Sequence, residues 1–154
     1  MSRAGSDDAT EQVHGTCVMI DDVGVLITGP SGSGKSDLAL RLMEGGAQLV
    51  ADDRVDLTLR QGQVIARAPL PLRGLLEARE VGILKFRSVE QAAIRAVISL
   101  NSSVVAERLP SEKSTILAGV EVRCFLIDPW QQSAPAKVRL VSQLVSGSIV
   151  RIDD

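Results

Sequence analysis

Residues 29–36 constrain this chain more than any other segment. They read Gly-Pro-Ser-Gly-Ser-Gly-Lys-Ser and match the P-loop pattern G-x-x-x-x-G-K-[ST]. Glycines in such a loop let backbone N–H groups point inward at phosphate oxygens, and the following helix directs its positive N-terminal end at the same anion. Lys35 is expected to contact the β- and γ-phosphates of a nucleotide, and the Ser36 hydroxyl to bind Mg²⁺. The candidate phosphate-binding residues are Gly29, Pro30, Ser31, Gly32, Ser33, Gly34, Lys35 and Ser36.

The segments on both sides of this loop have the character that a P-loop needs. Residues 23–28 form a continuous apolar run, which is typical of a strand buried on both faces. After the loop, apolar residues recur at helical spacing up to Glu44, and Gly45-Gly46 favours the end of a helix. The order strand, loop, helix therefore favours a phosphate-binding loop over a chance glycine-rich turn.

Composition and charge exclude several classes of function. The 154 residues carry a net charge of −2 and few aromatic side chains, which argues against a nucleic-acid partner. No apolar run approaches 18 residues and no signal-peptide pattern precedes the first strand, so we predict no membrane partner and a cytoplasmic location. Cys17 and Cys124 fit no metal-binding spacing and are interpreted as buried, reduced thiols.

Hydrophobic patterning predicts a single domain over 13–146, between an N-terminal tail (1–12) and a C-terminal tail (147–154). Single strands are predicted over 13–20, 23–28, 47–51, 83–86 and 92–100. Hairpins are predicted over 55–66 and over 116–122, the second continued by 125–127. A loop or short helix is predicted over 74–82 and a second helix over 136–146. Strands thus cluster without intervening helices. We predict an α/β P-loop domain with a mixed, strand-rich sheet around one P-loop helix.

Two acidic residues follow the predicted strand 47–51, namely Asp52 and Asp53. In a P-loop fold, an acid at the end of a neighbouring strand can reach Mg²⁺ or the attacking group. The alternative is that both acids simply end a strand in solvent. Paired carboxylates after a buried strand, in a chain with a P-loop, favour the functional interpretation.

The ordered motifs from 14 to 82, about half of the chain, resemble the catalytic domain of HPr kinase/phosphorylase. They are His14-Gly15, Gly-Val-Leu-Ile-Thr-Gly over 24–29, Lys35-Ser36, and Leu-Val-Ala-Asp-Asp-Arg-Val over 49–55. The family's Leu-Glu-Ile-Arg-Gly-Leu-Gly-Ile signature is matched by Leu-Glu-Ala-Arg-Glu-Val-Gly-Ile over 76–83, with five of eight positions kept. The resemblance implies a fold like that of phosphoenolpyruvate carboxykinase around the P-loop.

The resemblance also implies an activity and its cofactors. Members use ATP and Mg²⁺ to phosphorylate a serine of the phosphocarrier HPr, and many reverse the reaction with inorganic phosphate. By position, Asp52 resembles the family's acid/base, and Asp53 its neighbour that helps to place Mg²⁺. Ser36 and Glu77 match magnesium-associated positions. The family forms hexamers, so a homo-oligomer is expected, and the partner is HPr or its nitrogen-branch homologue.

Two further residues are assigned by the same resemblance. His14 matches the family's active-site histidine, although a lone histidine is otherwise more often structural. Arg108 resembles the arginine that the family places near the transferred phosphate, although a solvated surface arginine explains it nearly as well.

The chain departs from the family pattern in three ways. The family's N-terminal domain is missing, as in the short form found in alphaproteobacteria, and Glu80 replaces a signature glycine. Residues 128–135 replace the basic Pro-Val-Arg-Pro-Gly-Arg segment tied to phosphorolysis, with Lys137 and Arg139 just beyond. Kinase activity is therefore the firmer expectation. A nucleotide-binding regulatory module without catalysis and a small-metabolite kinase remain the alternatives.

Overall fold

The computed structural model describes residues 11–100 and 110–152. Its strands are β1 (Glu11–His14), β2 (Thr16–Ile20), β3 (Val23–Thr28), β4 (Gln48–Ala51), β5 (Arg54–Arg60), β6 (Gln63–Arg67), β7 (Leu75–Ala78), β8 (Gly82–Lys85), β9 (Ala92–Leu100), β10 (Lys113–Leu117) and β11 (Val120–Ile127). Its helices are α1 (Lys35–Glu44), α2 (Ala134–Ser146) and a short 3₁₀ turn, η2 (Leu70–Leu72).

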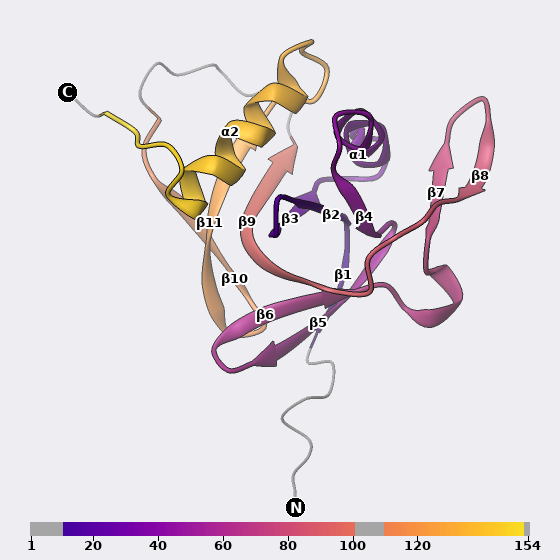
Figure 1. Ribbon diagram of the computed structural model, residues 1–154, viewed down its shortest axis with the longest axis horizontal. Coiled ribbons are helices and arrows are strands. Elements are labelled where there is room, and N and C mark those ends of the chain that lie inside the picture. Colours follow the sequence, from indigo (N-terminus) through magenta and orange to yellow (C-terminus); the bar gives the residue numbers. More distant parts are fainter. Residues whose placement is uncertain (1–10, 101–109, 153–154) are drawn as a thin grey trace, which may run out of the picture.

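A mixed sheet forms the body of the molecule (Figure 1). Its strand order is β1-β5-β6-β9-β3-β2-β4, and β11 and β10 continue from the far end of β9. Three strands are parallel, because β9 pairs with both β3 and β11 in that sense, whereas the other pairs are antiparallel. The predicted mixed, strand-rich sheet is thus confirmed.

The long strand β9 makes the sheet curl. Its first residues, Ala92 and Ala93, pair with β6, and its last four pair with β11. Because successive side chains of a strand point to opposite faces, the sheet has two apolar layers. Val25 and Ile27 pack toward α1 and α2, whereas Leu26 packs into the second layer enclosed by the curled strands. Both helices cover the first face (Figure 1).

Most predicted elements are confirmed, and two strands match residue for residue. These are β3 and β9, the buried runs 23–28 and 92–100. The hairpin of β2 and β3 turns at Asp21 and Asp22, both with positive φ, as the two-residue turn requires. Helix α1 ends at Glu44 as predicted, and α2 begins two residues early because Pro135 fits its first turn.

Two predictions about local structure are wrong. The single strand predicted over 13–20 is split at Gly15, and β1 begins at Glu11, inside the predicted tail. A Cβ on Gly15 would lie 2.9 Å from the Ile27 carbonyl oxygen, so the chain passes too close for a larger residue. The loop or short helix predicted over 74–82 contains strand β7, which pairs with β8 in a separate hairpin.

Within residues 11–100 and 110–152, no helix is long and apolar enough to cross a membrane. The turn predicted at 101–103 lies outside the described residues.

Candidate functional site

The glycine-rich loop, residues 29–36, connects β3 to α1 and turns the backbone around the N-terminus of that helix. Gly32 and Gly34 have φ angles of 79° and 98°, which glycine adopts without steric cost. The Ser33 N–H donates to the Pro30 carbonyl at 3.0 Å, and the Leu38 N–H donates to the Gly34 carbonyl at 2.9 Å. The loop therefore curls into the first turn of α1, where a helix attracts anions.

The loop already holds a positive charge and an unused hydroxyl. Lys35 Nζ donates to the carbonyl oxygens of Gly29 at 2.8 Å and Pro30 at 3.1 Å, so the ammonium lies across the loop. Ser33 Oγ is buried and has no hydrogen-bond partner among the described residues. A buried hydroxyl without a partner is costly, and glycine-rich loops that bind ligands often carry such strain. Both observations fit a phosphate-binding loop.

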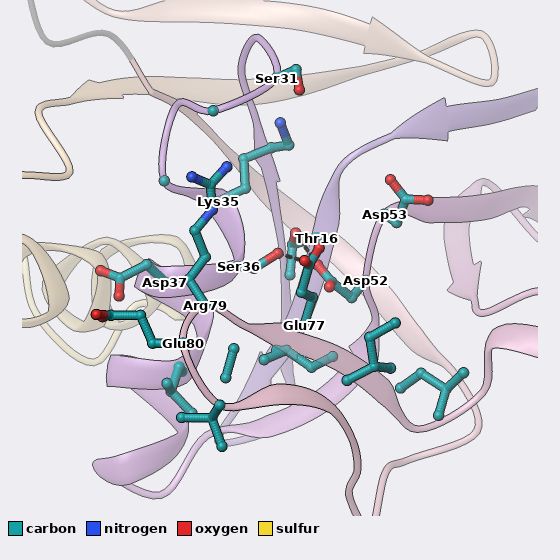
Figure 2. A pocket seen from close by; sticks show the side chains of 18 of the residues that line it. Thr16, Ser31, Lys35, Ser36, Asp37, Asp52, Asp53, Glu77, Arg79 and Glu80 are labelled. Atoms are coloured by element: carbon teal, nitrogen blue, oxygen red, sulfur yellow. Dashed lines mark hydrogen bonds between the residues drawn. The ribbon is translucent and has the colours of Figure 1, made fainter.

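Three polar side chains from different elements meet beside the loop (Figure 2). Asp52, which follows β4 and is 7% exposed, accepts two hydrogen bonds on Oδ1. Thr16 Oγ1 of β2 donates one at 2.8 Å, and Ser36 Oγ of α1 donates the other, also at 2.8 Å. Because charge-assisted hydrogen bonds are the stronger kind, this cluster fixes the carboxylate against the first turn of α1.

Asp53 directs its carboxylate away from this cluster (Figure 2). Its φ is 71°, and the Arg54 N–H donates to the Asp52 carbonyl at 2.8 Å, which closes a tight γ-turn around Asp53. The Gly15 N–H donates to the Asp53 carbonyl at 3.2 Å and ties this turn to the start of β2. The turn therefore separates the two carboxylates: one is buried against α1 and the other is exposed.

The hairpin of β7 and β8 forms the opposite wall of a cleft of about 600 Å³. Glu77 is exposed and points toward the Ser36 and Asp52 cluster, while Arg79 extends toward the glycine-rich loop (Figure 2). Glu80, with φ of 74°, lies at the turn of the hairpin. Leu76 is buried against α1, so the wall is anchored on the helix that follows the loop.

The oxygen donors in the cleft fit a magnesium ion that is shared with phosphate. The described residues contain no group of three or more His, Cys, Asp or Glu side chains that could hold a metal alone. Ser36 and Glu77 nevertheless face the same space, and Mg²⁺ is normally bound by one or two protein oxygens together with phosphates and water.

The structure brings together most of the residues that the sequence predicted. Lys35, Ser36, Asp52, Asp53 and Glu77 line the cleft, together with the loop residues Ser31, Gly32 and Gly34. Gly29, Pro30 and Ser33 belong to the loop but do not line the cleft.

Other residues that the sequence singled out lie elsewhere. His14 is exposed at the end of β1 and is not among the residues lining the cleft, and Arg108 lies outside the described residues. Arg139 binds the carbonyl of Leu42 at 3.4 Å, at the far end of α1 from the loop, and Lys137 Nζ binds Gln131.

Sequence reasoning missed three residues of the site: Thr16, Arg79 and Trp130. Thr16 is a lone hydroxyl residue at the start of an apolar strand, which gives no signal by itself. Arg79 belongs to the motif over 76–83, in which the resemblance assigns a role to Glu77 alone. Trp130 follows β11 and lines the cleft beside the loop, a position that depends on the order of strands in the sheet.

Comparison with known proteins identifies the family. The family model described as HPr Serine kinase C-terminal domain matches residues 8–128, so this chain belongs to that family. It is 43% identical over 103 residues to the HPr kinase/phosphorylase of Latilactobacillus sakei, covering 66% of this chain and 33% of the relative. For the HPr kinase/phosphorylase of Lactobacillus delbrueckii, identity is 38% over 122 residues, covering 71% and 39%. The chain thus spans a third to two fifths of the length of these relatives.

The fold is also that of a solved relative. The structure of the HPr(Ser) kinase/phosphatase from Coxiella burnetii superposes with a TM-score of 0.80 and 27% sequence identity. The match covers 90% of this chain and 98% of the solved chain.

Proposed function

Starting from membership of this family, we propose that the chain is an ATP-dependent kinase that phosphorylates a serine of an HPr-type phosphocarrier protein. The observation that carries the proposal is the buried carboxylate of Asp52, held by Thr16 and Ser36 beside a glycine-rich loop. A carboxylate next to a phosphate-binding loop is the arrangement that phosphoryl transfer to a hydroxyl requires.

The glycine-rich loop would hold the β- and γ-phosphates of ATP. Its N–H groups and the N-terminus of α1 offer donors, and Lys35 would exchange the carbonyls of Gly29 and Pro30 for phosphate oxygens. Ser36 and Glu77 would hold Mg²⁺, which when bound neutralises charge on the phosphates.

Asp52 would act as the general base. Both of its hydrogen bonds from described residues fall on Oδ1, which leaves Oδ2 to take the proton of the substrate serine. The serine oxygen then forms a bond to the γ-phosphorus while the bond between that phosphorus and the β,γ-bridging oxygen breaks, and ADP leaves. Arg79 and Lys35 would offset the negative charge on the transferred group.

The proposal is limited to the forward reaction. Phosphorolysis needs cationic groups around inorganic phosphate, and Lys137 and Arg139 lie just beyond the replaced segment. Neither lines the cleft. The hexameric assembly implied by the family resemblance stays a prediction.

A transfer assay tests the proposal. The chain is incubated with labelled ATP, Mg²⁺ and either HPr or its nitrogen-branch homologue, and the labelled residue is located by mass spectrometry. We expect label on one serine, and Asp52→Asn to reduce the rate by about a hundred-fold to ten-thousand-fold with ATP affinity nearly unchanged.

Asp22→Asn is the matched control, because it makes the same chemical change in the turn before β3, at the opposite end of that strand from the loop. Asparagine tolerates positive φ, so this variant should retain full activity. Normal turnover by Asp52→Asn would show that the base is wrongly assigned. ATP binding without label on either carrier would favour a nucleotide-binding regulatory module.

A further inference from the structure

We propose that Trp130 is a base-binding residue, whose indole ring stacks on the base of the nucleotide held by the glycine-rich loop. The inference rests on the proposed function, because it requires a nucleotide in the cleft. The glycine-rich loop contacts the phosphates of the nucleotide, and Trp130 would add a contact to its base.

Sheet topology brings Trp130 to the loop. Strands β3, β9 and β11 are parallel, and their pairing sets Thr28 opposite Ser99 and Leu100 opposite Ile127. The three carboxyl ends therefore lie along one edge of the sheet. Ligands of α/β proteins bind at this edge, and different loops contact different parts of one ligand. The loop after β3 is the glycine-rich loop, and the loop after β11 carries Trp130 three residues beyond Ile127.

The backbone of this second loop is fixed, whereas the indole is left open to the cleft. The Trp130 N–H donates to Asp128 Oδ1 at 3.0 Å, and Arg41 of α1 donates to the Pro129 carbonyl. Trp130 is nonetheless 58% exposed. The other two aromatic residues, Phe86 and Phe125, are partly buried and pack against the core. Trp130 is thus an exposed aromatic group on a fixed backbone, and it belongs to neither apolar core layer of the described residues.

The indole also touches the loop directly. A Cβ built on Gly34 would lie 3.0 Å from Cη2 and 3.3 Å from Cζ2 of Trp130, so the benzo edge of the ring rests on the Gly34 backbone. Trp130 lines the same cleft as Lys35 and Ser36. A nucleotide whose phosphates occupy the loop must direct its ribose and base outward along this cleft, where an exposed aromatic face offers stacking.

Trp130 is the single tryptophan of the chain, so intrinsic fluorescence reports on this position alone. The probes are ATP and inorganic tripolyphosphate, each with Mg²⁺, and affinities are measured in parallel by calorimetry. Both probes occupy the glycine-rich loop, but only ATP carries a base. We expect ATP to quench the fluorescence and tripolyphosphate to leave it nearly unchanged.

Three variants separate stacking from support of the loop. Trp130→Ala should weaken ATP binding by about five-fold to a hundred-fold, the usual loss of an aromatic–base contact, and change tripolyphosphate affinity by less than about two-fold. Trp130→Phe should keep most of the ATP affinity. Leu126→Ala removes an exposed apolar side chain from β11 that does not line the cleft, and should alter neither affinity.

Two results would overturn the inference while leaving the phosphate loop intact. One is unchanged ATP affinity in Trp130→Ala; the other is an equal loss for both probes, which would mean that the indole only supports the loop. Failure of the wild-type chain to bind either probe would instead reject the phosphate-binding loop itself, and the base contact with it.

Discussion

The Thr16 hydroxyl should be essential to the geometry of the proposed base, and Thr16→Val tests this directly. The side chain is fully buried, and its Oγ1 donates to Asp52 Oδ1 at 2.8 Å. Valine has nearly the same shape but cannot donate a hydrogen bond. The variant therefore removes one of the two donors to Oδ1 and leaves Ser36 as the other.

The structure sets the expected magnitude. A hydrogen bond to a charged group contributes about 1.5–3 kcal/mol to stability. Removing one of the two bonds to a buried carboxylate should destabilise the folded protein by a similar amount. We therefore expect Thr16→Val to lower the free energy of unfolding by about 1.5–3 kcal/mol. If Asp52 takes the proton of the substrate, the same loss of positioning should lower kcat by roughly ten-fold or more and leave the affinity for ATP nearly unchanged.

The measurement combines urea unfolding with steady-state transfer to the carrier. Thr16→Ser restores the hydroxyl and should recover most of kcat, which a purely structural role of the methyl group would not produce. Thr58→Val is the matched control, because Thr58 is also buried and its hydroxyl bonds to none of the described residues. Wild-type kcat in a folded Thr16→Val protein would refute the positioning role.

Two further predictions concern the loop and a buried thiol. Gly34→Ala places a Cβ at a residue whose φ is 98° and only 3.0 Å from Trp130, so it should destabilise the protein by about 1–3 kcal/mol and weaken ATP binding. Gly62→Ala, at φ of 78° with open space around its Cβ, should show only the energetic cost of a positive φ and should bind ATP normally. Burial raises the pKa of Cys17 from 9.0 to about 12, so its contribution to stability is complete below pH 9 and falls by up to about 1.4 kcal/mol per pH unit above it, as only the unfolded chain ionises. Urea unfolding between pH 8 and 10.5 should therefore give a steeper decline for the wild type than for Cys17→Ala, and equal slopes would contradict the assignment.

The sequence was sufficient for the parts of the site that depend on local order. A buried strand, a glycine-rich loop and an amphipathic helix follow one another directly, so the positions of Lys35 and Ser36 come from the chain itself. Asp52 was also predictable, because it ends a strand that is short, apolar and close in sequence. Its contact with Thr16 was not. That contact depends on β2 pairing with β4, which sets Cys17 opposite Ala51 and so brings the next residues together.

The hairpin of β7 and β8 could not be predicted from the sequence for a different physical reason. Strand β7 has four residues, of which only Leu76 and Ala78 are buried, while Glu77 is exposed in the cleft. Two buried positions are too few for a periodic signal, and the flanking glycines of the segment read equally well as a loop. The strand forms because β8 pairs with it and α1 covers Leu76, and neither partner can be identified from the segment itself.

Trp130 shows where sequence reasoning ends in this fold. A tryptophan after Asp-Pro in a loop has no periodicity and no motif, and the loop lies 96 residues after Gly34, the residue that its ring touches. The contact arises because β9 lies between β3 and β11 with both neighbours parallel, so that loops distant in sequence leave the sheet at one edge. Strand order is a property of the whole sheet, set by which long-range pairings bury the most apolar surface together. Trp130, the residue proposed to contact the base of the nucleotide, can therefore be identified only when the strand order is known.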